Sequence, residues 1–145
     1  MANHSYDIEA VSAAPIGLVF EVIADAPGWS RWNTTISRSQ WDIEGSPAPW
    51  GVGAVRALGA SVGPLSRERI VEFDAPNHQA YVIVSGPMPI KGYRADVHLT
   101  STANGGTRIS WKGSWTTRVP GVSGFLKKMV RGFASEAARE AERLQ

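Results

Sequence analysis

Three side chains in the middle of the chain could carry acid–base chemistry: Glu68, Tyr81 and Tyr93. A carboxylate in an apolar environment has a raised pKa and can exchange a proton near neutral pH. A buried tyrosine hydroxyl needs a hydrogen-bond partner, which suits it to orienting a ligand. These three residues are the catalytic candidates, and Glu68 is the one that would act as acid or base.

Other reactive groupings are poorly represented. The chain has no cysteine, which excludes thiolate catalysis and cysteine-based metal sites. His4, His78 and His98 do not fall at ligand spacing on one helix, so we expect neither a metal site nor any other cofactor. The glycines at 51 and 53 lead into a strand rather than a helix, unlike those of a nucleotide-binding loop.

Strands must position the candidate residues, because alternation and turn residues mark extended segments along most of the chain. The expected strands are Tyr6–Ser12, Ile36–Ile43, Val52–Ala60, Leu65–Asp74, Gln79–Gly86, Gly92–Thr100 and Thr107–Thr117. Strands at intervals of about ten residues, joined by turn residues, predict one continuous antiparallel sheet.

Helices are expected at two places. Two short helices lie between the first and second strands, and Pro15 suits the first turn of the earlier one. The long C-terminal helix, Gly121–Gln145, has apolar residues at steps of three and four. Phe125, Met129 and Phe133 make its first half bulky, whereas alanines fill the second half. The first half is therefore expected to roof a space and the second to dock closely.

Alternation also predicts which strand residues face this helix. The expected pocket residues are Ile70, Tyr81, Ile83, Ser85, Tyr93, Val97, Trp111, Gly113 and Trp115, beneath Phe125, Met129 and Phe133. The alternative is an ordinary filled core. The strand 65–74 stays open: Glu68 either faces inward with Ile70 or joins Arg69 in a surface ladder of charges, and a bulge would reverse its faces.

Two residues are candidates for the entrance of such a pocket. Trp50 lies in the Gly- and Pro-rich loop 44–51, and Met88 stands between two prolines. Amphipathic side chains at a mouth suit the capture of an apolar ligand, so transient contact with a membrane is expected. A rigid turn explains Met88 equally well.

Composition indicates one soluble domain over residues 1–145. The net charge is +2 and no block of Lys or Arg stands out, so nucleic acid is not an expected partner. We find no apolar run of membrane-spanning length and no basic-then-apolar leader, and therefore expect a cytoplasmic protein. The oligomeric state is left open between monomer and homodimer.

Motifs spread along the chain carry a resemblance to a known family. They are Ala14-Pro15, Phe20-Glu21, Asp25 to Asn33, Arg67 to Ile70 before Asp74-Ala75-Pro76, Tyr81 with Gly86, and Gly105 to Trp111. On these the chain resembles the Bet v 1-like, START-related superfamily (SRPBCC), and within it the bacterial polyketide cyclase/dehydrase and lipid-transport group. The resemblance implies an α+β helix-grip fold, in which a curved seven-stranded antiparallel sheet wraps around the C-terminal helix.

The resemblance also implies a cavity between helix and sheet that holds steroids, lipids, flavonoids or polyketide intermediates. Our first hypothesis is binding or transport of a small hydrophobic molecule; the alternatives are a polyketide cyclase, aromatase or dehydratase, and a protein–protein adaptor. An inward carboxylate bonded to an inward tyrosine would favour the enzyme. A pocket of apolar groups and hydroxyls would favour the carrier, and a pocket below ligand size the adaptor.

Overall fold

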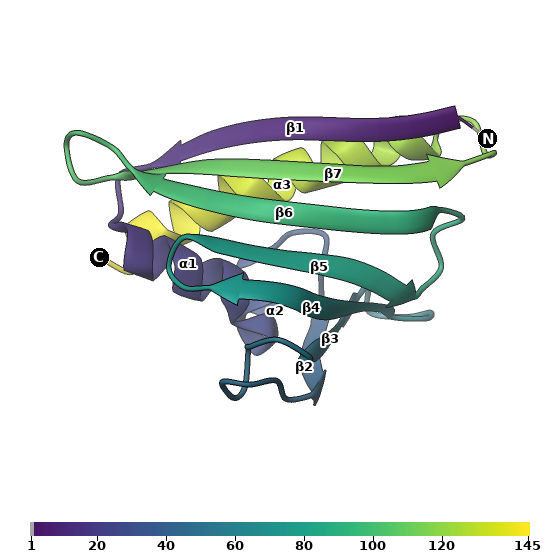
Figure 1. Ribbon diagram of the computed structural model, residues 1–145, viewed down its shortest axis with the longest axis horizontal. Helices are drawn as coiled ribbons and strands as arrows, with labels where there is room; N and C mark the ends of the chain where they lie inside the picture. Colours follow the sequence, from purple (N-terminus) through teal and green to yellow (C-terminus); the bar gives the residue numbers. More distant parts are fainter. Residues whose placement is uncertain (1) are drawn as a thin grey trace.

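The computed structural model describes residues 2–145, which form a single antiparallel sheet covered on one face by helices (Figure 1). The strands are β1 (Ala2–Ser12), β2 (Arg38–Ile43), β3 (Val55–Gly59), β4 (Ser66–Asp74), β5 (His78–Ser85), β6 (Lys91–Ser101) and β7 (Thr107–Thr117). Their order across the sheet is β1-β7-β6-β5-β4-β3-β2, so the first strand pairs with the last. The expected seven-stranded sheet is confirmed.

The helices are α1 (Ile16–Ala24), the single-turn η1 (Ala26–Gly28), α2 (Trp29–Trp32) and the long α3 (Val122–Arg143). Pro15 is the N-cap residue of α1, next to the first-turn position expected for it. In Figure 1, α3 runs behind β1, β7 and β6, and α1 lies near its C-terminal end. The expected short helices between β1 and β2 and the expected long C-terminal helix are thus confirmed. Among residues 2–145, none of the helices is both long and apolar enough to cross a membrane.

The two halves of α3 meet the sheet differently. Ala134, Ala137, Ala138 and Ala141 are buried, and the Ser12 hydroxyl of β1 donates to the Ala138 carbonyl at 2.8 Å. Small side chains allow this close approach of helix and strand. In the first half the Phe125 side chain is 57% exposed, although it belongs to the apolar stripe. The close packing of the alanine-rich half and the exposure of Phe125 in the bulky half agree with what the residue pattern predicts.

The inward faces of the strands follow the alternation, apart from two bulges. Tyr93 and Val97 on β6 are buried with the alternate residues between and beyond them. The register of β4 and β5 steps over residue 71 and again over residue 84. The second bulge turns Ser85 to the outer side, opposite Arg67, where it is exposed. The expectation that Ser85 faces inward is therefore wrong.

The open question of Glu68 is resolved by its burial. Glu68 and Ile70 both face inward, with 8% and 1% of their surfaces exposed. Arg69 is exposed, and Arg67 bonds Asp42 of β2 at 2.6 Å on the outer side. The interpretation of Glu68 as part of a surface ladder is therefore wrong. The bulge at residue 71 lies beyond these positions and so does not reverse the faces of Glu68 and Ile70.

Candidate functional site

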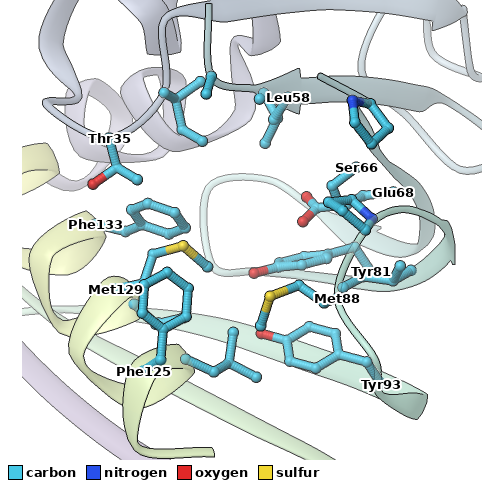
Figure 2. A pocket seen from close by; sticks show the side chains of 18 of the residues that line it. Thr35, Leu58, Ser66, Glu68, Tyr81, Met88, Tyr93, Phe125, Met129 and Phe133 are labelled. Carbon is cyan, nitrogen blue, oxygen red and sulfur yellow. The ribbon is translucent and has the colours of Figure 1, made fainter. Parts of the chain in front are cut away.

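A cavity of about 370 Å³ lies between the first half of α3 and the strands β3 to β6 (Figure 2). It is lined by Thr35, Ile36, Leu58, Gly59, Ala60, Val62, Pro64, Ser66, Glu68, Tyr81, Ile83, Pro87, Met88, Tyr93, Phe125, Leu126, Met129, Val130 and Phe133. Small-molecule sites commonly measure about 300–1,000 Å³, so the cavity is of ligand size. It lies beneath the half of α3 that carries Phe125, Met129 and Phe133.

The three catalytic candidates meet at one wall of this cavity. Glu68 comes from β4, Tyr81 from β5 and Tyr93 from β6. Figure 2 shows the Glu68 carboxylate and both tyrosine hydroxyls directed toward the space beneath Met129 and Phe133. Three neighbouring strands thus gather the carboxylate and the two phenol hydroxyls on one side of the space, whereas Thr35 lies on the side away from them.

Behind this wall lies Arg56, which the sequence analysis missed. Arg56 and Glu68 are direct cross-strand partners, and Arg56 Nε donates to Glu68 Oε1 at 2.8 Å. A second nitrogen, Nη1, donates to the Ile23 carbonyl at 3.1 Å. The guanidinium carbon lies 5.0 Å from the centre of the Trp29 ring and 4.7 Å from that of Tyr81. The arginine is therefore fixed between two aromatic rings and fully buried.

Two features of its surroundings shift the pKa of the Glu68 carboxyl in opposite directions. Burial raises the pKa of the Glu68 carboxyl, because a charged form is poorly solvated there, while the Arg56 guanidinium opposes the rise. Burial is the larger influence. Within residues 2–145 the hydrogen bond of this carboxylate goes to Arg56 and not to a tyrosine. Its other oxygen, Oε2, has no hydrogen-bond partner among the described residues.

The tyrosines belong to a buried hydrogen-bond network. The Tyr93 hydroxyl bonds the Tyr6 hydroxyl of β1, and Trp111 Nε1 donates to the Tyr81 hydroxyl at 3.1 Å. Burial, above all, raises the pKa of all three tyrosines well above its ordinary value. These phenols therefore stay protonated at physiological pH, where they can orient a ligand by hydrogen bonds but do not act as bases.

The predicted pocket residues fall into two groups. Those that line the cavity are Tyr81, Ile83, Tyr93, Phe125, Met129, Phe133 and the proposed entrance residue Met88. Those that lie outside it are Ile70, Ser85, Val97, Trp111, Gly113, Trp115 and the other proposed entrance residue, Trp50. Most of the second group do face inward, but they pack into the core rather than border the space.

Gly113 and Trp115 show why an inward direction does not place a residue at the cavity. The space beside Gly113 is filled by the Tyr6 ring, and a Cβ at Gly113 would come within 2.6 Å of the Tyr6 hydroxyl oxygen. Trp115 instead donates from Nε1 to the Ser123 hydroxyl at 3.0 Å. Gly113 is thus small because a tyrosine from β1 packs on it, not to admit a ligand.

Several lining residues were not expected, and they come from turns and from β3. Thr35 and Ile36 follow α2, and their amides are held by the Asn33 side-chain oxygen at 2.8 and 3.0 Å. Leu58 comes from β3, and Val62 from the loop after it. Neither loop has a periodic pattern, so no sequence signal beyond their apolar residues pointed to them.

On the outer face, the expectation about histidine spacing is incomplete. His78 and His98 are cross-strand partners whose rings stack 4.1 Å apart at 2°, and Asp96 bonds His78 Nε2 at 2.7 Å. Ligand atoms of the three lie within 4.8 Å of one another, a spacing that could hold a metal. Arg94 already bonds both Asp96 oxygens, at 3.0 and 3.2 Å. Spacing along one helix could not reveal this cluster, because it forms across two strands.

Comparison with known proteins gives the family of this chain and agrees with its fold. The family model described as "Polyketide cyclase / dehydrase and lipid transport" matches residues 3–145. The chain belongs to this family. Uncharacterized proteins of Mycobacterium bovis and Mycobacterium tuberculosis, 28% identical over 93 residues, match 64% of this chain. The chain spans only 54% of the length of these relatives.

Several solved structures have the same helix-grip architecture as this chain. The Zhui aromatase/cyclase from a Streptomyces species aligns with a TM-score of 0.78 at 18% identity, covering 98% of this chain and 95% of that one. A protein from Nitrosospira multiformis gives 0.77 at 20% identity, with 94% and 95% covered. Ara h 8.0201 gives 0.75 at 16% identity, with 98% and 99% covered. These similarities confirm the Bet v 1-like fold.

Proposed function

We propose that this protein binds and carries a small hydrophobic molecule, a lipid, steroid or polyketide-like compound, in the cavity beneath α3. The supporting observation is a ligand-sized space lined mainly by apolar side chains, with Glu68, Tyr81 and Tyr93 gathered at one wall. Burial of apolar surface contributes about 25 cal/mol per Å² and would supply most of the affinity. The few hydroxyls and the Glu68 carboxylate would orient the ligand.

The rim of the cavity supports uptake from solvent or from a membrane surface. Val62 and Phe125 line the cavity, yet they are 81% and 57% exposed. Large apolar side chains that line a cavity and also contact water mark its opening to the outside. Lys127 and Lys128 follow Phe125 on α3 and would favour an anionic lipid surface.

A cavity-filling variant and a matched control test this proposal. Met129→Trp adds an indole inside the cavity, whereas Lys128→Trp places the same side chain at the adjacent, exposed position of α3. The probe is N-phenyl-1-naphthylamine, an uncharged molecule whose fluorescence rises in apolar sites. We expect wild type and Lys128→Trp to bind it alike and Met129→Trp to lose at least about tenfold in affinity, a 1.4 kcal/mol change. Equal binding by all three would contradict the proposal.

Native mass spectrometry of the purified chain gives an independent check. A co-purified apolar molecule should appear with wild type and be reduced with Met129→Trp. A protein–protein adaptor is less well supported, because its cavity would be closed or below ligand size.

The same site supports a second candidate, an enzyme that moves a proton on a bound ketone. Glu68 is an ionisable group with a raised pKa at the wall of a mainly apolar cavity, which suits a general acid or base. The absence of a bond from Glu68 to a tyrosine among residues 2–145 ranks this candidate second. Its test is exchange of the α-protons of 2-tetralone for deuterium, followed by NMR. Acceleration over buffer that Glu68→Gln abolishes would support the enzyme, and a rate equal to buffer would contradict it.

A further inference from the structure

Glu68 and Tyr81 place an acceptor and a donor side by side on the polar wall of the cavity. Glu68 Oε1 is engaged by Arg56, and Oε2 has no hydrogen-bond partner within residues 2–145. The Tyr81 hydroxyl oxygen accepts from Trp111 Nε1 at 3.1 Å, and the Tyr6 and Tyr93 side chains are further polar neighbours of it within residues 2–145. Because these two hydroxyls bond each other, the Tyr81 proton can turn to an acceptor in the cavity. Both residues are buried, with 8% of Glu68 and 2% of Tyr81 exposed, and Figure 2 shows their polar groups directed into the same space.

Buried groups of this kind favour a ligand that completes their hydrogen bonds. An oxygen that both donates and accepts one hydrogen bond could donate to Glu68 and accept from Tyr81. An ether oxygen only accepts, and would leave the carboxylate of Glu68 without its bond. A hydroxyl group is the simplest chemical group that meets both requirements.

A carboxylate would fit this wall poorly. None of the described lining residues is Lys, Arg or His, so no cation is present to neutralise a bound anion. Arg56 lies behind Glu68 with no exposed surface, and it faces Glu68 rather than the cavity. An anionic ligand would therefore meet the Glu68 oxygen in an apolar space, where an unpaired charge is costly.

We propose that the cavity selects apolar molecules that end in a hydroxyl group, an alcohol or a phenol, and rejects those that end in a carboxylate. This inference rests on the proposed binding function, and it specifies which class of hydrophobic molecule the site takes. Fatty acids are then poor ligands, whereas compounds of similar shape with a hydroxyl group at the same end are good ones.

Three probes of matched shape test the selection by calorimetric titration of the full chain at pH 7.5. They are 2-naphthol, which donates and accepts; 2-methoxynaphthalene, which only accepts; and 2-naphthoate, which is an anion. We expect 2-naphthol to bind about tenfold more tightly than the ether, and 2-naphthoate to bind more weakly than both. A carboxylate that binds as tightly as the phenol would overturn the inference while leaving the binding function intact.

Single substitutions test whether Glu68 and Tyr81 cause the preference for a hydroxyl group over a carboxylate. Glu68→Gln keeps an acceptor for Arg56 and turns an N–H donor toward the cavity, so the preference for 2-naphthol over 2-naphthoate should shrink severalfold. Tyr81→Phe should weaken 2-naphthol severalfold, and it tests the wall independently if Glu68→Gln folds poorly. Glu72→Gln, on the exposed side of β4, is the matched control and should change nothing. An undiminished preference in both cavity variants would contradict the inference.

The outcomes also separate failure of this inference from failure of the proposed function. If N-phenyl-1-naphthylamine binds and the naphthalene probes do not, the selection for hydroxyl groups is wrong and the carrier function stands. If no probe binds at all, both are wrong.

Discussion

Arg56 and Glu68 face each other across β3 and β4, and their side chains meet at 2.8 Å beneath the cavity wall. Arg56 is fully buried and Glu68 is 8% exposed. The pair joins the site to the rest of the core, because Arg56 also stacks on Trp29 and bonds the Ile23 carbonyl at the end of α1. The polar wall is thus held in place by the helices at the far side of the core.

The first prediction concerns the stability that this pair supports. Arg56→Met should reduce the free energy of unfolding by roughly 3–5 kcal/mol at pH 7, because it leaves Glu68 without its partner. Arg56→Met combined with Glu68→Leu should recover most of the loss, since no buried charge then remains. Urea unfolding followed by circular dichroism measures both.

An exposed ion pair provides the control for that experiment. Arg67 and Asp42 meet at 2.6 Å on the outer side of the sheet, where the Arg67 side chain is 43% exposed. Arg67→Met should cost no more than about 1 kcal/mol. If the double variant at 56 and 68 were as unstable as Arg56→Met alone, the loss would come from packing rather than from an unpaired charge.

The second prediction is a pH dependence of Glu68. Burial raises the pKa of this carboxyl above the ordinary 4.5, so the folded chain holds its proton to a higher pH than the unfolded chain does. Ionisation therefore weakens the fold as the pH rises from about 4.5 through the raised value. Unfolding free energies of wild type and Glu68→Gln from pH 4 to 8 should diverge in favour of the variant. Divergence in the other direction would mean that the attraction of Arg56 outweighs burial.

The third prediction concerns Gly113, which packs against Tyr6. Gly113→Ala should destabilise the protein by about 1–3 kcal/mol, because the added methyl group overlaps the Tyr6 ring. Gly124→Ala is the matched control: it lies in α3 with open space around it, and should stabilise the chain by roughly 1 kcal/mol. Thermal unfolding distinguishes the two. A neutral Gly113→Ala would show that the Tyr6 ring can move aside.

The fourth prediction concerns the rim of the cavity. Val62→Ser and Phe125→Ser each remove an exposed apolar side chain at the opening, and together should reduce association with anionic vesicles severalfold. Cosedimentation with phosphatidylglycerol-containing vesicles measures this. Val11→Ser is a control, because Val11 is 58% exposed but does not line the cavity. An equal loss from the control would indicate nonspecific adhesion.

Much of the architecture could be predicted because each element has its own periodic signal. The last strand was predicted with its observed bounds, Thr107–Thr117, since its alternation of polar and apolar residues is unbroken. Ser85 was misplaced because a bulge changes the phase of a strand without a clear mark in its composition. Local patterns thus predict elements better than they predict irregularities within them.

The site was harder to predict, because a void depends on which side chains meet from distant segments. Trp111 faces inward as expected, but Tyr81 and Phe133 lie between it and the cavity. Arg56 was missed because β3 is buried on both faces, so alternation carries no information there. A charged residue inside an apolar strand was the available signal, and its pairing with Glu68 required the register of the sheet.

The alanine-rich half of α3 is buried against the rest of the domain, whereas the half that borders the cavity includes the exposed Phe125, so the two halves should differ in local stability. Backbone amides near Ala137 should exchange with deuterium only when the whole domain unfolds, whereas those near Met129 can exchange through local opening. A ligand in the cavity would contact the half of α3 around Met129 and slow amide exchange there, while exchange around Ala137 would stay unchanged. The helix would then report occupancy through a difference between its own two ends.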